Sequence, residues 1–163
     1  QAASLPGCIT CHSNHKIAHT SDAMLGTGKD SVCMQCHSEG DAGYKEAAEI
    51  AQDLNKLDTA VKNSDALLAR AEDSGMEVSE AKIEQDQARD SLTKARVSIH
   101  SLQAARVDKD IQAGLKVAAK TAQAGKEALA ERDFRRKGLG VSLIAILIML
   151  VGLAMYIRQI EKD

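Results

Sequence analysis

IAQDLNKLDTAVKNSDALL, residues 50–68, contains a repeat from which most of the architecture follows. Apolar or small side chains recur at alternating spacings of four and three residues, the heptad pattern of helices that pack along a seam. The seam positions are Ile50, Leu54, Leu57, Val61, Ser64 and Leu68. No proline interrupts residues 44–137. The pattern therefore predicts a long helix that buries one face.

Two further seams follow in the same segment. The second comprises Ala81, Gln85, Ala88, Leu92, Ala95, Ile99 and Leu102, and the third comprises Val107, Ile111, Leu115, Ala118, Ala122, Gly125 and Leu129. The tripeptide at residues 73–75 (Asp-Ser-Gly) separates the first two seams and predicts an antiparallel, coiled-coil-like helical hairpin. Ser101 and the charged cluster at residues 108–110 predict a bend. The stalk is expected over residues 43–136, with breaks near residues 73–77 and 101–108.

A long apolar run lies close to the C-terminus. Residues 138–157, GLGVSLIAILIMLVGLAMYI, contain no charged side chain. At about 1.5 Å per residue such a helix spans roughly 30 Å, the thickness of the hydrocarbon layer. A buried soluble helix would need a large surrounding core, which a chain with 2% aromatic residues does not supply. We predict a transmembrane helix at residues 137–158, in contact with membrane lipid, and a short tail at 159–163.

The N-terminal block contains two copies of Cys-x-x-Cys-His. Cys8 and Cys11 precede His12, and the second copy repeats this spacing with Cys33, Cys36 and His37. This pentapeptide is the attachment signature of c-type haem. The two thiols of each copy bond the vinyl groups of one porphyrin, and the histidine is the proximal iron ligand. Residues 1–42 are therefore expected to form a small, loop-rich module with two covalent haem c groups.

The cysteine pattern has two other interpretations. The four thiols could hold one zinc ion, but a zinc site has no use for a histidine directly after each pair. Disulfides suit an exported protein, but a bond within Cys-x-x-Cys closes a strained ring suited to redox turnover. Both interpretations account for less of the pattern than haem attachment does.

Each haem iron also needs a ligand on its other face. His15, His19 and His100 are the candidates, and two of the three are needed if both haems are bis-histidine. Met24 is an alternative that would give a higher potential. If the hairpin folds about Gly75, residue 100 comes level with residue 50, near the haem end of the stalk. Met34 lies inside its own attachment loop and cannot reach across the ring.

The segments CITCHSNH and CMQCH resemble the doubled-CxxCH class of multihaem cytochromes. The remainder, from GYKEAAEIAQDLNKL to ERDFRRKGLGVSL, looks like the C-terminal module of membrane-anchored bacterial multihaem cytochromes. The resemblance implies an electron relay of a respiratory chain rather than an enzyme. Its expected partners are a quinol-oxidising membrane complex, other cytochromes and the helices of neighbouring subunits. A nitrite- or hydroxylamine-type reductase subunit with an open haem site is the alternative function.

The compartment follows from the same motifs. Haem is attached to c-type motifs on the exported side, so we expect a single-pass protein of the bacterial cytoplasmic membrane with its haem module in the periplasm. The flanking cations are Arg132, Arg135, Arg136 and Lys137 before the apolar run and Arg158 and Lys162 after it. The positive-inside rule alone would favour the opposite orientation. A net charge of −2 gives no electrostatic case for nucleic acid.

Residues 1–7 are too short for a secretory signal peptide and contain no apolar run. Either a signal was removed before Gln1 or the chain belongs to a longer precursor. A cleaved export signal would set the topology first, and the last helix would then act as a stop. For this reason we expect the orientation of the membrane helix to follow from the haem motifs and not from the flanking charges.

Overall fold

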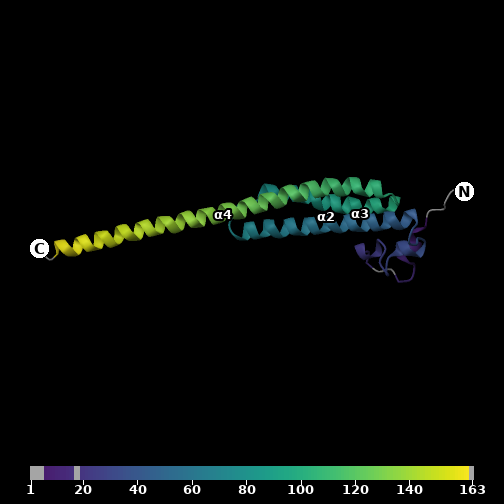
Figure 1. The fold of residues 1–163 in the computed structure, drawn as a ribbon, viewed down its shortest axis with the longest axis horizontal. Coiled ribbons are helices and arrows are strands. Elements are labelled where there is room, and N and C mark those ends of the chain that lie inside the picture. The colour runs from purple at the N-terminus through teal and green to yellow at the C-terminus, as the bar shows by residue number, and fades with distance from the viewer. Residues whose placement is uncertain (1–5, 17–18, 162–163) are drawn as a thin grey trace.

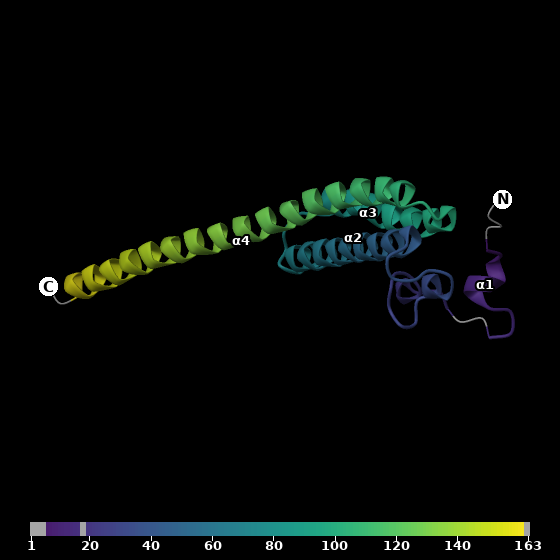
Figure 2. The same cartoon turned by 45° about the vertical axis from the view of Figure 1, so that its right-hand side comes forward.

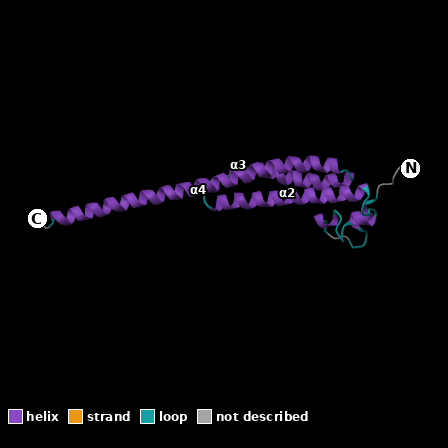
Figure 3. Cartoon of the chain, in the orientation of Figure 1, coloured by secondary structure: helices purple, strands orange, loops and turns teal. Residues whose placement is uncertain are grey.

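The computed structural model describes residues 6–16 and 19–161, and within them the protein is almost entirely helical (Figure 3). The α-helices are α1 (Cys8–His12), α2 (Ala42–Asp73), α3 (Ser79–Ser98) and α4 (Ala104–Ile160). Short 3-10 helices are η1 (Asp22–Met24), η2 (Val32–Gln35) and η3 (Ile99–Ser101). The expected class, a small loop-rich module followed by long helices, is confirmed.

The stalk is a bundle of three helices (Figure 1). α2 and α3 form the expected antiparallel hairpin, and α4 then reverses the chain again and packs along both. The predicted bend near residues 101–108 is therefore a full reversal. It is made by η3 and by Leu102, whose φ of 53° lies in the left-handed region. Leu102 was expected in the second seam, but the turn leaves its side chain 48% exposed.

The seam on α2 is confirmed at every position. All six side chains are buried, and the four at Ile50, Leu54, Leu57 and Val61 belong to one core cluster with Ala88, Val107 and Ile111. A second, smaller cluster closes the far end of the bundle, beside the loop at Gly75, where Leu68, Ala71 and Val78 meet. The fold is held by continuous apolar burial along three helices, as the heptad spacing requires.

The seam on α4 differs from the expected one. Its buried positions are Val107, Ile111, Gly114, Ala118, Thr121 and Gly125, so that Leu115 and Ala122 are only half-buried. The reason is close helix approach. A Cβ at position 114 would lie 2.8 Å from Leu57 and 2.9 Å from Ser91, so only glycine fits there. The alternating spacing thus continues through small residues, not through the larger Leu115.

A buried polar layer crosses the middle of the bundle. Thr121 Oγ1 on α4 donates to Gln85 Oε1 on α3 at 2.6 Å and lies 2.8 Å from Ser64 Oγ on α2. Gln85 Nε2 donates to the Val61 carbonyl at 3.1 Å and to Asp65 Oδ1 at 2.9 Å. Within the described residues no buried side-chain nitrogen or oxygen lacks a partner. The layer links all three helices and specifies their register.

α4 leaves the bundle and continues alone (Figure 1). Arg132 Nη1 donates to Ser74 Oγ at 3.0 Å at the end of the bundle. From residue 133 as far as Ile160, the side chains of α4 are exposed. This part of α4 is long and apolar enough to cross a membrane and fits a membrane anchor. The cysteine-containing module lies at the opposite end of the bundle, beside the start of α2 (Figure 2).

Candidate functional site

The first Cys-x-x-Cys-His motif is a single helical turn, α1. Cys8 and Cys11 are three residues apart, so their side chains lie on the same face of the turn. Thr10 N donates to the Gly7 carbonyl at 3.0 Å, and Ser13, with a φ of 64°, ends the helix directly after His12. Both thiols are free, with Cys8 exposed and Cys11 half-buried. Two thiols and one imidazole therefore project from a single helical turn.

The second motif is built on the 3-10 helix η2. Ser31 caps it by accepting a hydrogen bond from Cys33 N at 3.2 Å, and its hydroxyl also donates to the Gly26 carbonyl. Gly26 has a φ of 93°, and a Cβ there would lie 2.8 Å from Ala51 on α2. The loop before the motif is therefore seated directly on α2. Cys33 and Cys36 are also free thiols.

The four thiols do not converge on one point. Among the described residues, which include all four cysteines, no group of three or more metal-binding side chains is positioned to hold a single ion. No disulfide links them. The zinc and disulfide interpretations therefore have no geometric support, whereas two separate pairs of free thiols, each followed by an imidazole, fit two attachment sites.

His37 is oriented by the start of α2. Its Nδ1 lies 3.4 Å from Asp41 Oδ1, and its ring lies so close to Gly43 that a Cβ there would be 2.0 Å from Cε1. Asp41 caps α2 by accepting from Tyr44 N at 2.6 Å, and it accepts from Ser38 N at 2.9 Å. These backbone N–H groups lower the pKa of Asp41, and His37 lowers it further. A carboxylate beside Nδ1 leaves Nε2 available for iron.

Asp41 and Gly43 were not expected from the sequence. The signal that would have found Asp41 is its position directly before a long proline-free helix, where aspartate is a preferred N-cap residue. That position is also four residues after His37, within side-chain reach. Nothing in the spacing alone identifies Gly43, because its role depends on where the His37 ring lies.

His100 lies beside the first motif. The ring centroids of His12 and His100 are 6.2 Å apart, and the ring planes are inclined by 27°. His100 is held in η3, and its Nδ1 lies 3.0 Å from the Val97 carbonyl. The expected fold-back therefore brings this residue to the cysteine-containing end of the bundle.

The other expected candidates are near the motifs but less constrained. His15 is exposed, with Nδ1 2.7 Å from Asn14 Oδ1, and His19 is also exposed. Met24 is half-buried in η1. The roles of His15 and His19 as distal ligands remain predictions.

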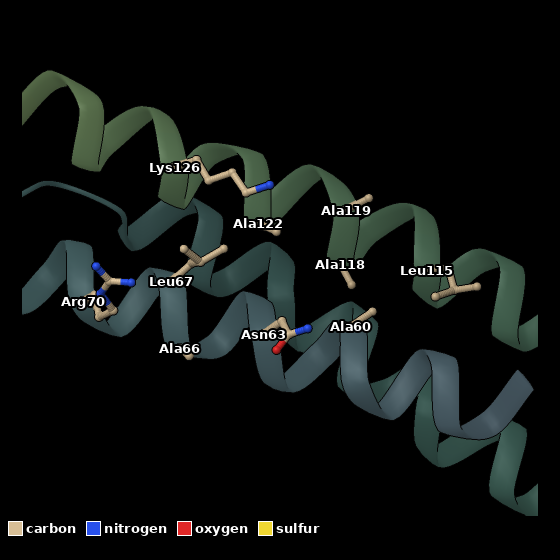
Figure 4. Close-up of a pocket in the computed structure, with 10 residues that line it drawn as sticks. All are labelled: Ala60, Asn63, Ala66, Leu67, Arg70, Leu115, Ala118, Ala119, Ala122 and Lys126. Carbon is tan, nitrogen blue, oxygen red and sulfur yellow. The ribbon is translucent and has the colours of Figure 1, made fainter. Parts of the chain in front are cut away.

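An open hollow along the bundle is not part of this site (Figure 4). It is an open groove of about 740 Å³ between α2 and α4, lined by Ala60, Asn63, Ala66, Leu67, Arg70, Leu115, Ala118, Ala119, Ala122 and Lys126. It contains neither cysteine nor histidine. The alanine side chains in its lining are too small to fill the space between the parallel helices α2 and α4, which explains the groove.

Residues 2–42 match a protein-family model, the doubled CXXCH motif. The match covers the N-terminal module and ends where α2 begins. No curated protein and no solved structure matches the chain. The match is consistent with a multihaem c-type cytochrome of the doubled-CXXCH class, and it supports covalently bound haem c as the cofactor of this module. The free thiol pairs and the imidazoles that follow them fit this group.

Proposed function

We propose that this protein is a membrane-anchored dihaem electron carrier on the exported face of a bacterial membrane. The haem groups would supply one-electron chemistry. Cys8 and Cys11 would tether one haem and Cys33 and Cys36 the other, with His12 and His37 as proximal ligands. Asp41 would fix the His37 ring so that Nε2 faces the iron, and a carboxylate in this position makes the imidazole a stronger donor.

The separation between the motifs and the anchor carries the proposal. α2 has 32 residues and is therefore about 48 Å long, and the motifs lie at the end of the bundle opposite the exit of α4. Electron tunnelling weakens steeply with distance, so haems held there are too far from the bilayer to react with a quinol inside it. The electron donor is then the exposed surface of a quinol-oxidising complex, and the acceptor is another cytochrome.

Bis-histidine ligation of both haems would also favour a relay over an enzyme. Iron that binds histidine on both faces has no vacant position for a small molecule, so it exchanges electrons only. The anchor keeps the carrier at a fixed height above the membrane. The bundle surface can contact neighbouring subunits, which supports a place within a larger assembly.

The test uses the full chain purified in detergent from an exporting host. The pyridine haemochrome assay should give two covalent haems per chain, and both should remain low-spin when carbon monoxide or cyanide is added. A stoichiometric high-spin haem that binds these ligands would overturn the relay and favour a reductase-type subunit.

The orientation in the membrane is tested separately, on intact membranes. Protease added to the exported side should digest the haem module and spare the C-terminal tail.

A further inference from the structure

The end of the bundle next to the first motif is hollowed. The hollow has a volume of about 580 Å³ and is lined by Val97, Ser98, His100, Ser101, Arg106, Lys109 and Asp110. These residues come from the end of α3, from η3 and from the first turns of α4. Among these lining residues, His100 approaches the first Cys-x-x-Cys-His motif through the contact of its ring with His12.

The distance between these two imidazoles is suited to a shared metal. A nitrogen ligand lies about 2 Å from a metal ion, and the centre of an imidazole ring lies about 1 Å behind that nitrogen. Two imidazoles on opposite faces of one iron therefore have ring centres roughly 6 Å apart. The observed separation of the His12 and His100 ring centroids, 6.2 Å, matches this distance, and the two rings are stacked with an interplanar angle of 27°.

The hydrogen bond made by His100 is also suited to metal binding. Its Nδ1 lies 3.0 Å from the Val97 carbonyl oxygen, which can only accept, so Nδ1 carries the proton. Nε2 then has a free lone pair. A backbone carbonyl that accepts from one ring nitrogen while the other binds metal is the usual arrangement for a ligating histidine.

The charges in the hollow favour an anionic group. Arg106 and Lys109 are exposed cations, and among the described residues neither forms an ion pair. Asp110, the acidic residue in the lining, is occupied by a hydrogen bond from Ser98 Oγ at 2.7 Å. A haem carries two propionate groups, and carboxylates pair well with free arginine and lysine side chains.

We propose that His100 is the distal axial ligand of the haem attached at Cys8 and Cys11, and that Arg106 and Lys109 face its propionates. This inference rests on the proposed function and deepens it. The haem would then join the N-terminal motif to the end of the bundle through iron. His15 or His19 would remain to complete the second haem.

The main test compares two variants of His100 in the full haem-loaded chain. His100→Ala should convert one of the two haems to high spin and allow it to bind carbon monoxide. His100→Met should keep both haems low-spin and raise the reduction potential of one, because methionine ligation raises the potential. Gln103→Ala, an exposed position in the same turn, is the control and should leave the spectrum and both potentials unchanged.

A further pair of substitutions tests the propionate contacts. Arg106→Gln with Lys109→Gln should leave both haems low-spin and lower the potential of one haem, since two positive charges near the iron have been removed. Unchanged potentials in this double variant would overturn the assignment of these two side chains. The far-ultraviolet circular dichroism of each variant should show an intact helical bundle, and His100→Met keeps the ligand test valid if His100→Ala does not fold.

The inference and the proposed function fail in different ways. A parent protein without covalent haem in the haemochrome assay would overturn both. Two covalent low-spin haems in the parent, with unchanged spin state and potentials in both His100 variants, would overturn the His100 assignment and leave the electron carrier intact.

Discussion

Arg96 on α3 binds both carboxylate oxygens of Asp22, with Nε 2.9 Å from Oδ1 and Nη2 2.7 Å from Oδ2. Asp22 lies in η1, between the two Cys-x-x-Cys-His motifs, so this bidentate pair fastens the module to the bundle. Asp58 on α2 lies 3.4 Å from the same guanidinium. The hydrogen bonds from Arg96 to Asp22 raise the pKa of the arginine, and both carboxylates add to this effect electrostatically.

Arg96→Gln should loosen the module without unfolding the bundle. The pair is partly exposed, and such pairs contribute about 0–1 kcal/mol to global stability. Amide hydrogen exchange should become faster at residues 20–31, while the seam of α2 stays protected. Arg96→Lys should have a similar effect, because lysine cannot bind both oxygens in a fork.

Arg89→Gln is the matched control for this prediction. Arg89 lies on the same helix and pairs with Asp65 and Asp86, which belong to the bundle. It should change global stability by a similar amount and leave exchange at residues 20–31 unaffected. Equal exchange in that loop for both variants would show that the module is held by other contacts.

Gly43→Ala should separate helix stability from haem ligation. Alanine is a better helix former than glycine, by about 1 kcal/mol in a helix interior and less in a first turn. Its Cβ would nevertheless lie 2.0 Å from His37 Cε1, so the ring must move. We expect an equal or higher unfolding temperature together with a shifted potential and spectrum of one haem.

Gly28→Ala is the control, because a Cβ at that position has no neighbour within 4 Å. It should leave both haems unchanged. If Gly43→Ala also leaves both potentials unchanged, the His37 ring does not lie against α2 in the haem-loaded protein.

Thr121→Val should destabilise the bundle. The substitution removes the hydroxyl that joins Ser64 to Gln85, leaving buried polar atoms without partners at a cost of about 1–3 kcal/mol. Urea unfolding followed by circular dichroism measures this change. Thr93→Val, on the exposed face of α3, is the control and should cost much less. Equal losses would indicate that the polar layer contributes no specific stability.

Truncation after Arg136 should give a soluble, haem-loaded protein. It removes the exposed apolar part of α4 and leaves intact the bundle, whose last contact to α2 is made by Arg132. Ultracentrifugation of lysed cells that lack partner subunits measures the distribution, and the full-length chain is the control. A truncated protein that sediments wholly with membranes would contradict the assignment of this segment as the anchor.

Three features that the sequence indicates by itself depend only on neighbouring residues: the paired thiols, the apolar run and the α2 seam. Attachment of haem requires Cys8, Cys11 and His12 within one turn, and a membrane anchor requires only a sufficiently long apolar run. The α2 seam is equally local, since heptad spacing alone determines which side chains share a face of a helix. These properties do not depend on the conformation of the rest of the chain.

The tertiary structure decides the remainder, because it depends on how closely separate segments approach. Because position 114 is glycine, the side chains of Leu57 and Ser91 can approach α4 closely at this point. The buried seam of α4 therefore runs through Gly114 and Thr121 in place of Leu115 and Ala122. The second chain reversal makes a hairpin into a three-helix bundle. The hairpin about Gly75 returns His100 to the cysteine-containing end of the bundle, as the sequence predicts, but only the packing of the N-terminal module against that end places its ring 6.2 Å from that of His12.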